Sequence, residues 1–308
     1  MILDMEKPDI EKLGLKMDAL GVWDEIEPFN FAVKPKGTVF PYFCTVLKGD
    51  NAPVKIRFLM LEGWQTLHDY VRVRIDRNFG YYSSPMEMPH LELVVTVNRE
   101  VKLFRHDAGY IPVEANEKQC KLAAKILWEA YGVMLRVESD RMLPLKYTDN
   151  RAIFSRVEAS DGKWVDEPLI IPNPAPYTET IKLQKDVVKA AKDLPFDSNA
   201  AIELDMHILP GVMTKELRPR AVYELVAYND AGEKIISKCA SVNPESGLKA
   251  LWEMLAGEVL SALVQYGTIP GQIKVMSARV FRFIRPLCME LMFKLSMHDK
   301  LRYIAKNT

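Results

Sequence analysis

The sequence is poor in the features that assign a protein to a class at first sight. Its 308 residues include four cysteines, and none lies close to another in the chain: Cys44, Cys120, Cys239 and Cys288. Structural zinc sites and disulfide frameworks need cysteines at short spacings. Neither a cysteine-based zinc site nor a disulfide framework is therefore indicated, and the apolar stretches around the four positions predict buried, reduced thiols.

Long hydrophobic runs are also missing. No apolar run approaches the roughly 20 residues that a membrane-spanning helix needs. The first residues, "MILDMEKPDIEKLG", carry acids where a secretory signal has basic residues and then a long apolar core. The sequence therefore predicts a cytoplasmic protein without a membrane partner.

Charge of one sign is not in excess. The chain has 41 Lys plus Arg and 41 Asp plus Glu, so no overall field attracts it to nucleic acid or to an anionic membrane. The partner stays unknown at this point. A protein partner and a locally bound nucleic acid are both open, and nucleic acid is the less favoured.

Common catalytic signatures are missing too. The motif G-x-S-x-G, a phosphate-binding glycine loop and H-E-x-x-H do not occur. This absence favours a non-enzymatic binding or interaction protein that uses no cofactor. The alternative, which rests on the C-terminal half, is a nuclease or phosphodiesterase that uses Mg²⁺ or Mn²⁺.

Length and composition predict the domain organisation. Hydrophobic residues make up 48% and charged residues 27% of the chain, as in ordinary globular proteins, and the length favours two domains. We predict an α+β protein with domains over residues 1–170 and 171–308. A proline-rich linker over about 168–176 separates them, because its four prolines exclude a helix or a central strand.

Local signals predict individual elements of the N-terminal domain. Asp9 begins a helix, and residues 63–82 have helical spacing of apolar positions. A hairpin turns at Asn98-Arg99. Asn116 and Gln119 have the spacing of a capping box, and we expect Gly132 to end that helix, with a strand over residues 133–139.

The C-terminal domain has the predicted order βββαβαβα, which is similar to the ribonuclease H-like fold. In that fold carboxylates on the first strand, the first helix and the fourth strand hold two divalent metals. Asp205 matches the first strand, where Glu203 is a second candidate, and Glu253 or Glu258 could supply the helix carboxylate. After the fourth strand stand Ser277 and Arg279 instead of an acid, so we expect a scaffold without nuclease chemistry.

A polar row on the first strand of this domain allows two interpretations. In "AIELDMHI" the polar residues Glu203, Asp205 and His207 alternate with four apolar ones, so they share one face. The favoured interpretation is a strand face in water. The alternative is a metal site, for which Asp205 and His207 are the candidate ligands.

Basic and aromatic residues are interleaved over residues 70–82, which include Arg72, Arg74, Arg77, Tyr81 and Tyr82. Such a pattern can bind single-stranded nucleic acid, but a salt-bridged helix followed by an aromatic loop is favoured. The loop over residues 80–89 is the best candidate for a small binding cleft.

Histidines supply a last set of candidates. His106 is a candidate ligand-binding residue at a strand end, and His90 is expected to be structural. The spacing of His68, His90 and His106 in the sequence does not indicate whether the three side chains converge in space.

Several stretches together resemble an uncharacterised bacterial two-domain family of unknown function. They include "RFLMLEGWQTLHDYVRVRIDRNFGYYSSPMEMPHLELV", "LFRHDAGYIP", "ILWEAYGVMLRVESDRMLPLKY" and "YGTIPGQIKVMSARVFRFIRPLCMEL". The resemblance implies a bacterial cytoplasmic protein with two domains. It implies no activity, cofactor or catalytic residue. In C-terminal domains of this kind an acid often follows the strand equivalent to "QIKVM", where this chain has Ser277-Ala278-Arg279.

Overall fold

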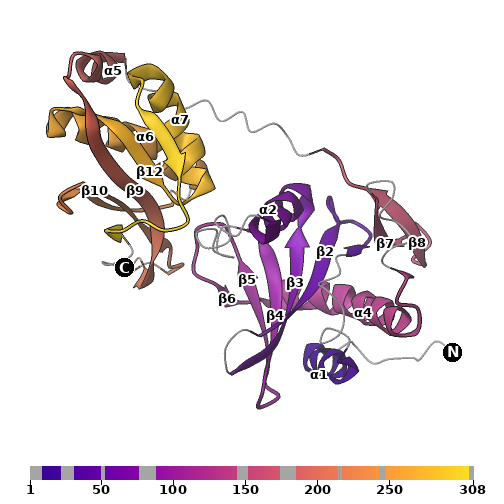
Figure 1. Cartoon of the computed structure of the whole chain (residues 1–308). Coiled ribbons are helices and arrows are strands. Elements are labelled where there is room, and N and C mark those ends of the chain that lie inside the picture. The colour runs from indigo at the N-terminus through magenta and orange to yellow at the C-terminus, as the bar shows by residue number, and fades with distance from the viewer. Residues whose placement is uncertain are drawn as a thin grey trace. The chain divides into compact units, whose positions relative to one another are not determined.

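The protein has mixed α+β structure in two compact units, which confirms the predicted fold class. The structure, a computed structural model, describes residues 9–21, 31–49, 53–75, 88–143, 152–173, 185–213, 215, 217–242 and 247–304, a few of them by their backbone alone (Figure 1). One unit consists of Met1–Tyr70, Met88–Asp107 and Pro112–Ala175, and the other of Val71–Glu87, Ala108–Ile111 and Pro176–Thr308. Each unit is described by itself below.

An eight-stranded sheet forms the frame of the first unit. Its spatial order is β6-β5-β4-β3-β2-β1-β7-β8. Neighbouring strands run antiparallel except β1 and β7, which are parallel. The strands are β1 (Phe31–Lys34), β2 (Tyr42–Lys48), β3 (Val54–Glu62), β4 (His90–Thr96), β5 (Val101–His106), β6 (Val113–Glu114), β7 (Ala152–Glu158) and β8 (Trp164–Ile170).

Two helices cover one face of this sheet. The predicted helix starts are confirmed: α1 (Ile10–Leu20) begins after Asp9, which caps it, and Asn116 forms the predicted capping box with Gln119 at α4 (Glu117–Ser139). Both helices bury an apolar stripe against alternate residues of the strands, as amphipathic helices do. The core of this unit includes Leu13, Met17, Phe58, Leu91, Leu93, Leu127, Val133 and Phe154.

The opposite face of the same sheet carries a third helix, α2 (Gly63–Ile75), where the sequence predicted one. Its Trp64 ring lies 5.0 Å from the ring of Phe43 on β2. Phe43 points away from the core under α1 and α4, because the neighbouring Tyr42 and Cys44 point into it. Leu67 of α2 is also buried.

The predicted end of α4 at Gly132, with a strand after it, is wrong. The helix continues to Ser139 and ends at Asp140. Val133 and Val137 are fully buried in the core, so the helical stripe continues past the glycine. Burial of these side chains outweighs the roughly 1 kcal/mol that an internal glycine costs a helix.

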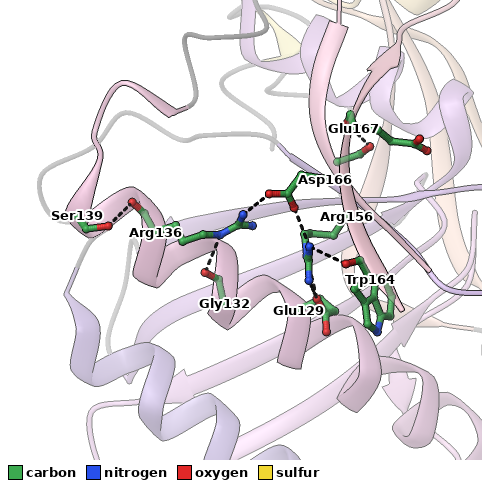
Figure 2. A network of polar contacts seen from close by, with 9 residues as sticks. Glu129, Gly132, Arg136, Ser139, Arg156, Trp164, Asp166 and Glu167 are labelled. Atoms are coloured by element: carbon green, nitrogen blue, oxygen red, sulfur yellow. Dashed lines mark hydrogen bonds and ion pairs between the residues drawn. The ribbon is translucent and has the colours of Figure 1, made fainter. Parts of the chain in front are cut away.

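A polar network fastens this second half of α4 to β7 and β8 (Figure 2). Arg156 on β7 donates to Glu129 of α4 at 2.8–2.9 Å and to Asp166 of β8 at 2.8 Å. Arg136 lies about two turns after Glu129 in α4, and it binds the other oxygen of Asp166. The network directly joins residues that lie up to 30 positions apart in the sequence, and no local signal predicts it.

Proline-rich residues at the end of this unit start within the sheet. Pro168 lies in β8, the edge strand. An edge strand tolerates proline because its outer side needs no hydrogen-bond donor. Beyond residue 173 the predicted linker lies outside the described residues.

The second unit contains a five-stranded sheet of order β11-β10-β9-β12-β13. β9 (Phe196–Met213), β10 (Ala221–Asn229) and β11 (Lys234–Ser241) form an antiparallel meander, and β12 (Ile269–Val275) and β13 (Lys294–Met297) run parallel to β9. α5 (Lys185–Lys192), α6 (Gly247–Tyr266) and α7 (Ala278–Leu291) pack their apolar side chains on one face with Ile202, Leu204 and Met206 of β9.

The other face of this sheet is covered near its middle by the end of the described chain. Leu301 and Ile304 are buried against Val226, Tyr228 and Met276. At the start of β10, residues 109–111 pair with residues 219–221 through backbone hydrogen bonds of 3.0 Å. No helix within the described ranges combines the length and the apolar character that crossing a bilayer requires.

Candidate metal centre

Three polar side chains are buried together in the first unit, on the sheet face opposite α1 and α4. His90 and Glu92 alternate along β4 with Leu91 and Leu93, which belong to the core. His106 on β5 is the direct cross-strand neighbour of His90. The three residues are 1%, 4% and 5% exposed, so each needs a partner other than bulk water.

Glu92 is held from both sides. Its Oε1 accepts a hydrogen bond from Nε of Arg57 on β3, and its Oε2 lies 2.6 Å from Nε2 of His106. The second contact is short but lacks the alignment of an N–H···O hydrogen bond. The two atoms are therefore in close contact without a directed hydrogen bond.

His90 is fixed with one nitrogen available. Its Nδ1 lies 2.6 Å from the carbonyl oxygen of Met88. A carbonyl oxygen only accepts, so Nδ1 carries the proton and Nε2 carries the lone pair. Among the described residues, Nε2 of His90 has no hydrogen-bond partner. An Nδ1–H···O=C bond that leaves Nε2 free is the usual orientation of a metal-binding histidine.

The protonation states also suit metal binding. Burial, and next the neighbouring His106, lower the pKa of His90 from 6.5 to about 3. Burial alone would raise the pKa of Glu92, but its contacts with His106 and Arg57 outweigh burial and lower the pKa to about 2. At neutral pH His90 is neutral and Glu92 is ionised, which are the forms that bind metal ions.

The ligand atoms of His90, Glu92 and His106 all lie within 4.8 Å of one another. Ligands on one zinc ion stand about 2.0–2.2 Å from it and thus at most about 4 Å apart, so small side-chain rotations suffice. Within the described part of the chain, this is the only such group of three or more. The sequence indicated His106 as a binding residue but not Glu92 or Arg57, because the approach of these two side chains depends on strand register.

The polar row of β9 is not a solvated face at its first two positions. Glu203 is 8% exposed and Asp205 is fully buried. The carboxylate of Glu203 accepts hydrogen bonds of 2.7–3.4 Å from three successive backbone N–H groups, those of residues 302–304. His207 is half-buried, with Nε2 3.6 Å from Glu224; burial lowers its pKa although Glu224 opposes the shift.

The carboxylates required for a two-metal nuclease do not converge among the described side chains. Asp205 points away from Leu204 and Met206, which face α6 and α7. Glu258 lies on the α6 side and pairs with Lys238 of β11. Asp205 and Glu258 are therefore on opposite faces of the sheet. The side chain of Glu253 is not among those that the structure describes. Ser277 has no carboxylate, and its hydroxyl oxygen accepts a hydrogen bond from the N–H of Val280 at the start of α7.

The basic and aromatic candidates are described only in part. Arg72 and Arg74 lie in α2, where the structure describes their backbone alone. Arg77, Tyr81, Tyr82 and residues 80–87 of the proposed binding loop lie outside the described residues. Next to the cluster, Arg105 binds Asp107 at 2.8 Å and Glu62 at 3.0 Å, so His106 and Asp107 have different partners.

Comparison with known proteins places one match on the C-terminal unit. Residues 187–306 match the model of a domain of unknown function, DUF6930. No curated protein and no solved structure matches the chain. The match covers the five-stranded sheet, α6, α7 and most of α5, and it does not include the cluster of His90, Glu92 and His106.

Proposed function

We propose that the protein is a metal-binding protein whose first unit holds a zinc-type ion between His90, Glu92 and His106. The observation that carries the proposal is the convergence of two imidazole rings and one carboxylate in a buried place. Burying such groups costs free energy unless they are satisfied. A bound cation would satisfy the lone pair of His90 Nε2 and the oxygen of Glu92 together.

The donor atoms select a class of ion. Imidazole nitrogen suits Zn²⁺, Co²⁺, Ni²⁺ and Cu²⁺, whereas Mg²⁺ and Ca²⁺ prefer sites built from oxygen. Two histidines and one glutamate leave one position of a tetrahedral zinc ion for water or another ligand. Because all three side chains are buried, the proposal favours an ion that stabilises the unit over one that performs catalysis, and the protein is proposed to act by binding.

Calorimetric titration of the chelator-treated protein with Zn²⁺ tests the proposal. We expect saturable binding of one ion and a higher melting temperature. At a Zn²⁺ concentration a hundred times the dissociation constant, an ion bound only by the folded state stabilises it by about 2.7 kcal/mol. Glu92→Gln keeps the size of the side chain but removes its charge, so both effects should be lost.

His207→Gln is the matched control. His207 is a half-buried histidine beside a glutamate, Glu224, but it lies outside the cluster. This variant should bind Zn²⁺ like the wild type. The proposal is wrong if the wild type binds no Zn²⁺, or if Glu92→Gln binds it as tightly as the wild type does.

A ribonuclease H-like fold for the C-terminal unit stays a proposal. It is supported by the order of its elements, a three-stranded meander followed by two parallel strands that helices connect. The placement of Asp205 and Glu258 on opposite faces gives no support to nuclease activity. Bacterial origin rests on the resemblance alone, and a reducing cytoplasm fits the four free cysteines.

A further inference from the structure

We propose that Arg57 determines which ions the site accepts, by holding Oε1 of Glu92 and so restricting this carboxylate to one donor oxygen. Arg57 is a positioning residue in this scheme, since it acts on the ion through Glu92. The inference rests on the proposed metal-binding function.

The geometry that supports it comes from strand register. On β3, Leu59 lies directly opposite Glu92 and Arg57 lies opposite Val94, so Arg57 is the diagonal neighbour of Glu92 on the same face. Diagonal neighbours are within reach of long side chains. Arg57 approaches Oε1 through Nε, while Oε2 faces His106.

The buried setting makes this arrangement hard to change. The side chain of Glu92 is 6% exposed and that of Arg57 is 27% exposed. If Glu92 turned both oxygens toward an ion, the guanidinium would lose its charge-assisted hydrogen bond without gaining full contact with water. Such bonds are about twice as strong as neutral ones. Carboxylate ligands are commonly held by partners of this kind behind the metal.

One oxygen and two nitrogens form a ligand set for a small, four-coordinate ion. Zn²⁺ and Co²⁺ accept such a set, but Ca²⁺ takes six to eight oxygen ligands and often binds a carboxylate through both oxygens. Large, oxygen-seeking ions would therefore be disfavoured as long as Arg57 occupies Oε1. Removing Arg57 should free Oε1 and weaken this discrimination.

The experiment compares Co²⁺ binding by the wild type and by Arg57→Met, in which an apolar side chain replaces the guanidinium. We expect the strong visible absorption of four-coordinate Co²⁺ in the wild type. The variant should show the weaker absorption of a higher-coordinate ion. The ratio of Co²⁺ to Ca²⁺ affinity should fall about tenfold or more, the scale on which outer partners of ligands alter metal binding.

Two further variants separate positioning from a general loss of charge. Lys55→Met removes the Lys55–Asp18 ion pair of 2.8 Å from the same strand, and it should leave the spectrum and the affinity ratio unchanged. Arg57→Lys restores a donor for Oε1 and should restore the wild-type spectrum at least in part. If the wild type and Arg57→Met have equal spectra and equal affinity ratios, the inference about Arg57 is wrong. Co²⁺ binding by both proteins would still support the proposed metal-binding function.

X-ray absorption by the Zn²⁺-loaded wild type provides a test that needs no variant. We expect one carboxylate oxygen and two imidazole nitrogens among the ligands of the ion. Two oxygens from the same carboxylate at bonding distance overturn the inference even if Arg57→Met fails to fold. Absence of both Zn²⁺ and Co²⁺ binding in the wild type overturns the proposed function itself, and the inference with it.

Discussion

The rings of His90 and His106 stack across β4 and β5, with centroids 4.0 Å apart and planes inclined by 15°. Two protonated imidazoles at this distance repel each other, and both rings are buried. This explains why burial and His106 together lower the pKa of His90 to about 3.

Acidification should unfold the metal-free protein more easily because of His90. The unfolded state takes up a proton at this residue near pH 6.5, whereas the folded state does so only near pH 3. Between these values the unfolded state binds more protons, so stability falls as the pH falls. Urea unfolding at pH 7 and pH 5, with a chelator present, should show a loss of about 2 kcal/mol from this residue.

His90→Gln removes the titrating group and should show a correspondingly smaller loss between the two pH values. Glu92 contributes little to the change in stability within this window. Its lowered pKa stabilises the folded state fully above about pH 4.5, and this stabilisation is lost only as the pH falls toward 2. An unchanged pH dependence in His90→Gln would show that His90 is not held neutral.

Gly132 and Gly267 should respond oppositely to alanine. Gly132 lies inside α4, and a Cβ there meets no heavy atom within 4 Å. Gly132→Ala should therefore stabilise the protein by about 0.5–1 kcal/mol. Gly267 ends α6 with φ +80°, where a Cβ is strained, so Gly267→Ala should cost about 1–2 kcal/mol.

Thermal or urea unfolding of both variants measures the difference. Destabilisation by Gly132→Ala would favour the helix end that the sequence predicted at this position over the continuous helix. The comparison tests a particular residue at which sequence and structure disagree.

Local signals in the sequence predicted most elements of the described fold. Asn116 with Gln119 marked the start of α4, and the turn at Asn98-Arg99 joined β4 and β5 as expected. Both signals act within four residues, so the sequence contains them completely. The helix end predicted at Gly132 was wrong because the effect of a glycine depends on tertiary contacts. Burial of Val133 and Val137 stabilises the helix beyond this residue. The strands β1, β6, β7 and β8 were missed.

The candidate site was predicted far less well than the fold. His106 was proposed as a binding residue, but Glu92 has the ordinary pattern of a polar residue on an alternating strand. Arg57 reaches Glu92 only because β3 and β4 pair in one register, and register is not readable from either strand alone. The acids on β9 were candidate site residues because of their alternating spacing. The carboxylate of Glu203, however, accepts hydrogen bonds from the backbone N–H groups of residues 302 and 303.

Glu203 should be much more important for stability than Glu258, although both were nuclease candidates. The Glu203 carboxylate satisfies backbone N–H groups of residues 302–304 in a buried place. Glu203→Ala should cost about 2–3 kcal/mol, as expected for hydrogen bonds to a charged group. The Glu258–Lys238 pair is partly exposed, with side chains 27% and 46% accessible, so Glu258→Ala should cost less than about 1 kcal/mol.

Urea unfolding gives the two free energies, and hydrogen exchange locates the effect. The amide of Tyr303, which donates to Glu203 over 2.7 Å, should exchange faster in Glu203→Ala and at the wild-type rate in Glu258→Ala. Equal losses of stability in the two variants would contradict the role of Glu203 as the acceptor for the backbone N–H groups of residues 302–304.

The network of Figure 2 predicts that removing Arg156 is worse than removing Arg156 and Glu129 together. Glu129 is 8% exposed, and burial raises its pKa while its bonds to Arg156 oppose the shift. Arg156→Met leaves this carboxylate buried without its main cation, which should cost about 3 kcal/mol or more at pH 7. Adding Glu129→Gln removes the unpaired charge and should recover a large part of that loss.

The pH dependence of the single variant distinguishes an unpaired charge from lost packing. Without Arg156 the pKa of Glu129 should rise further, so protonation near pH 5 relieves the buried charge and the deficit relative to the wild type should shrink. A packing defect would persist unchanged at pH 5 and in the double variant. Lys125→Met removes the Lys125–Glu158 pair on the same helix, where the lysine is 43% exposed, and should cost less than about 1 kcal/mol at either pH.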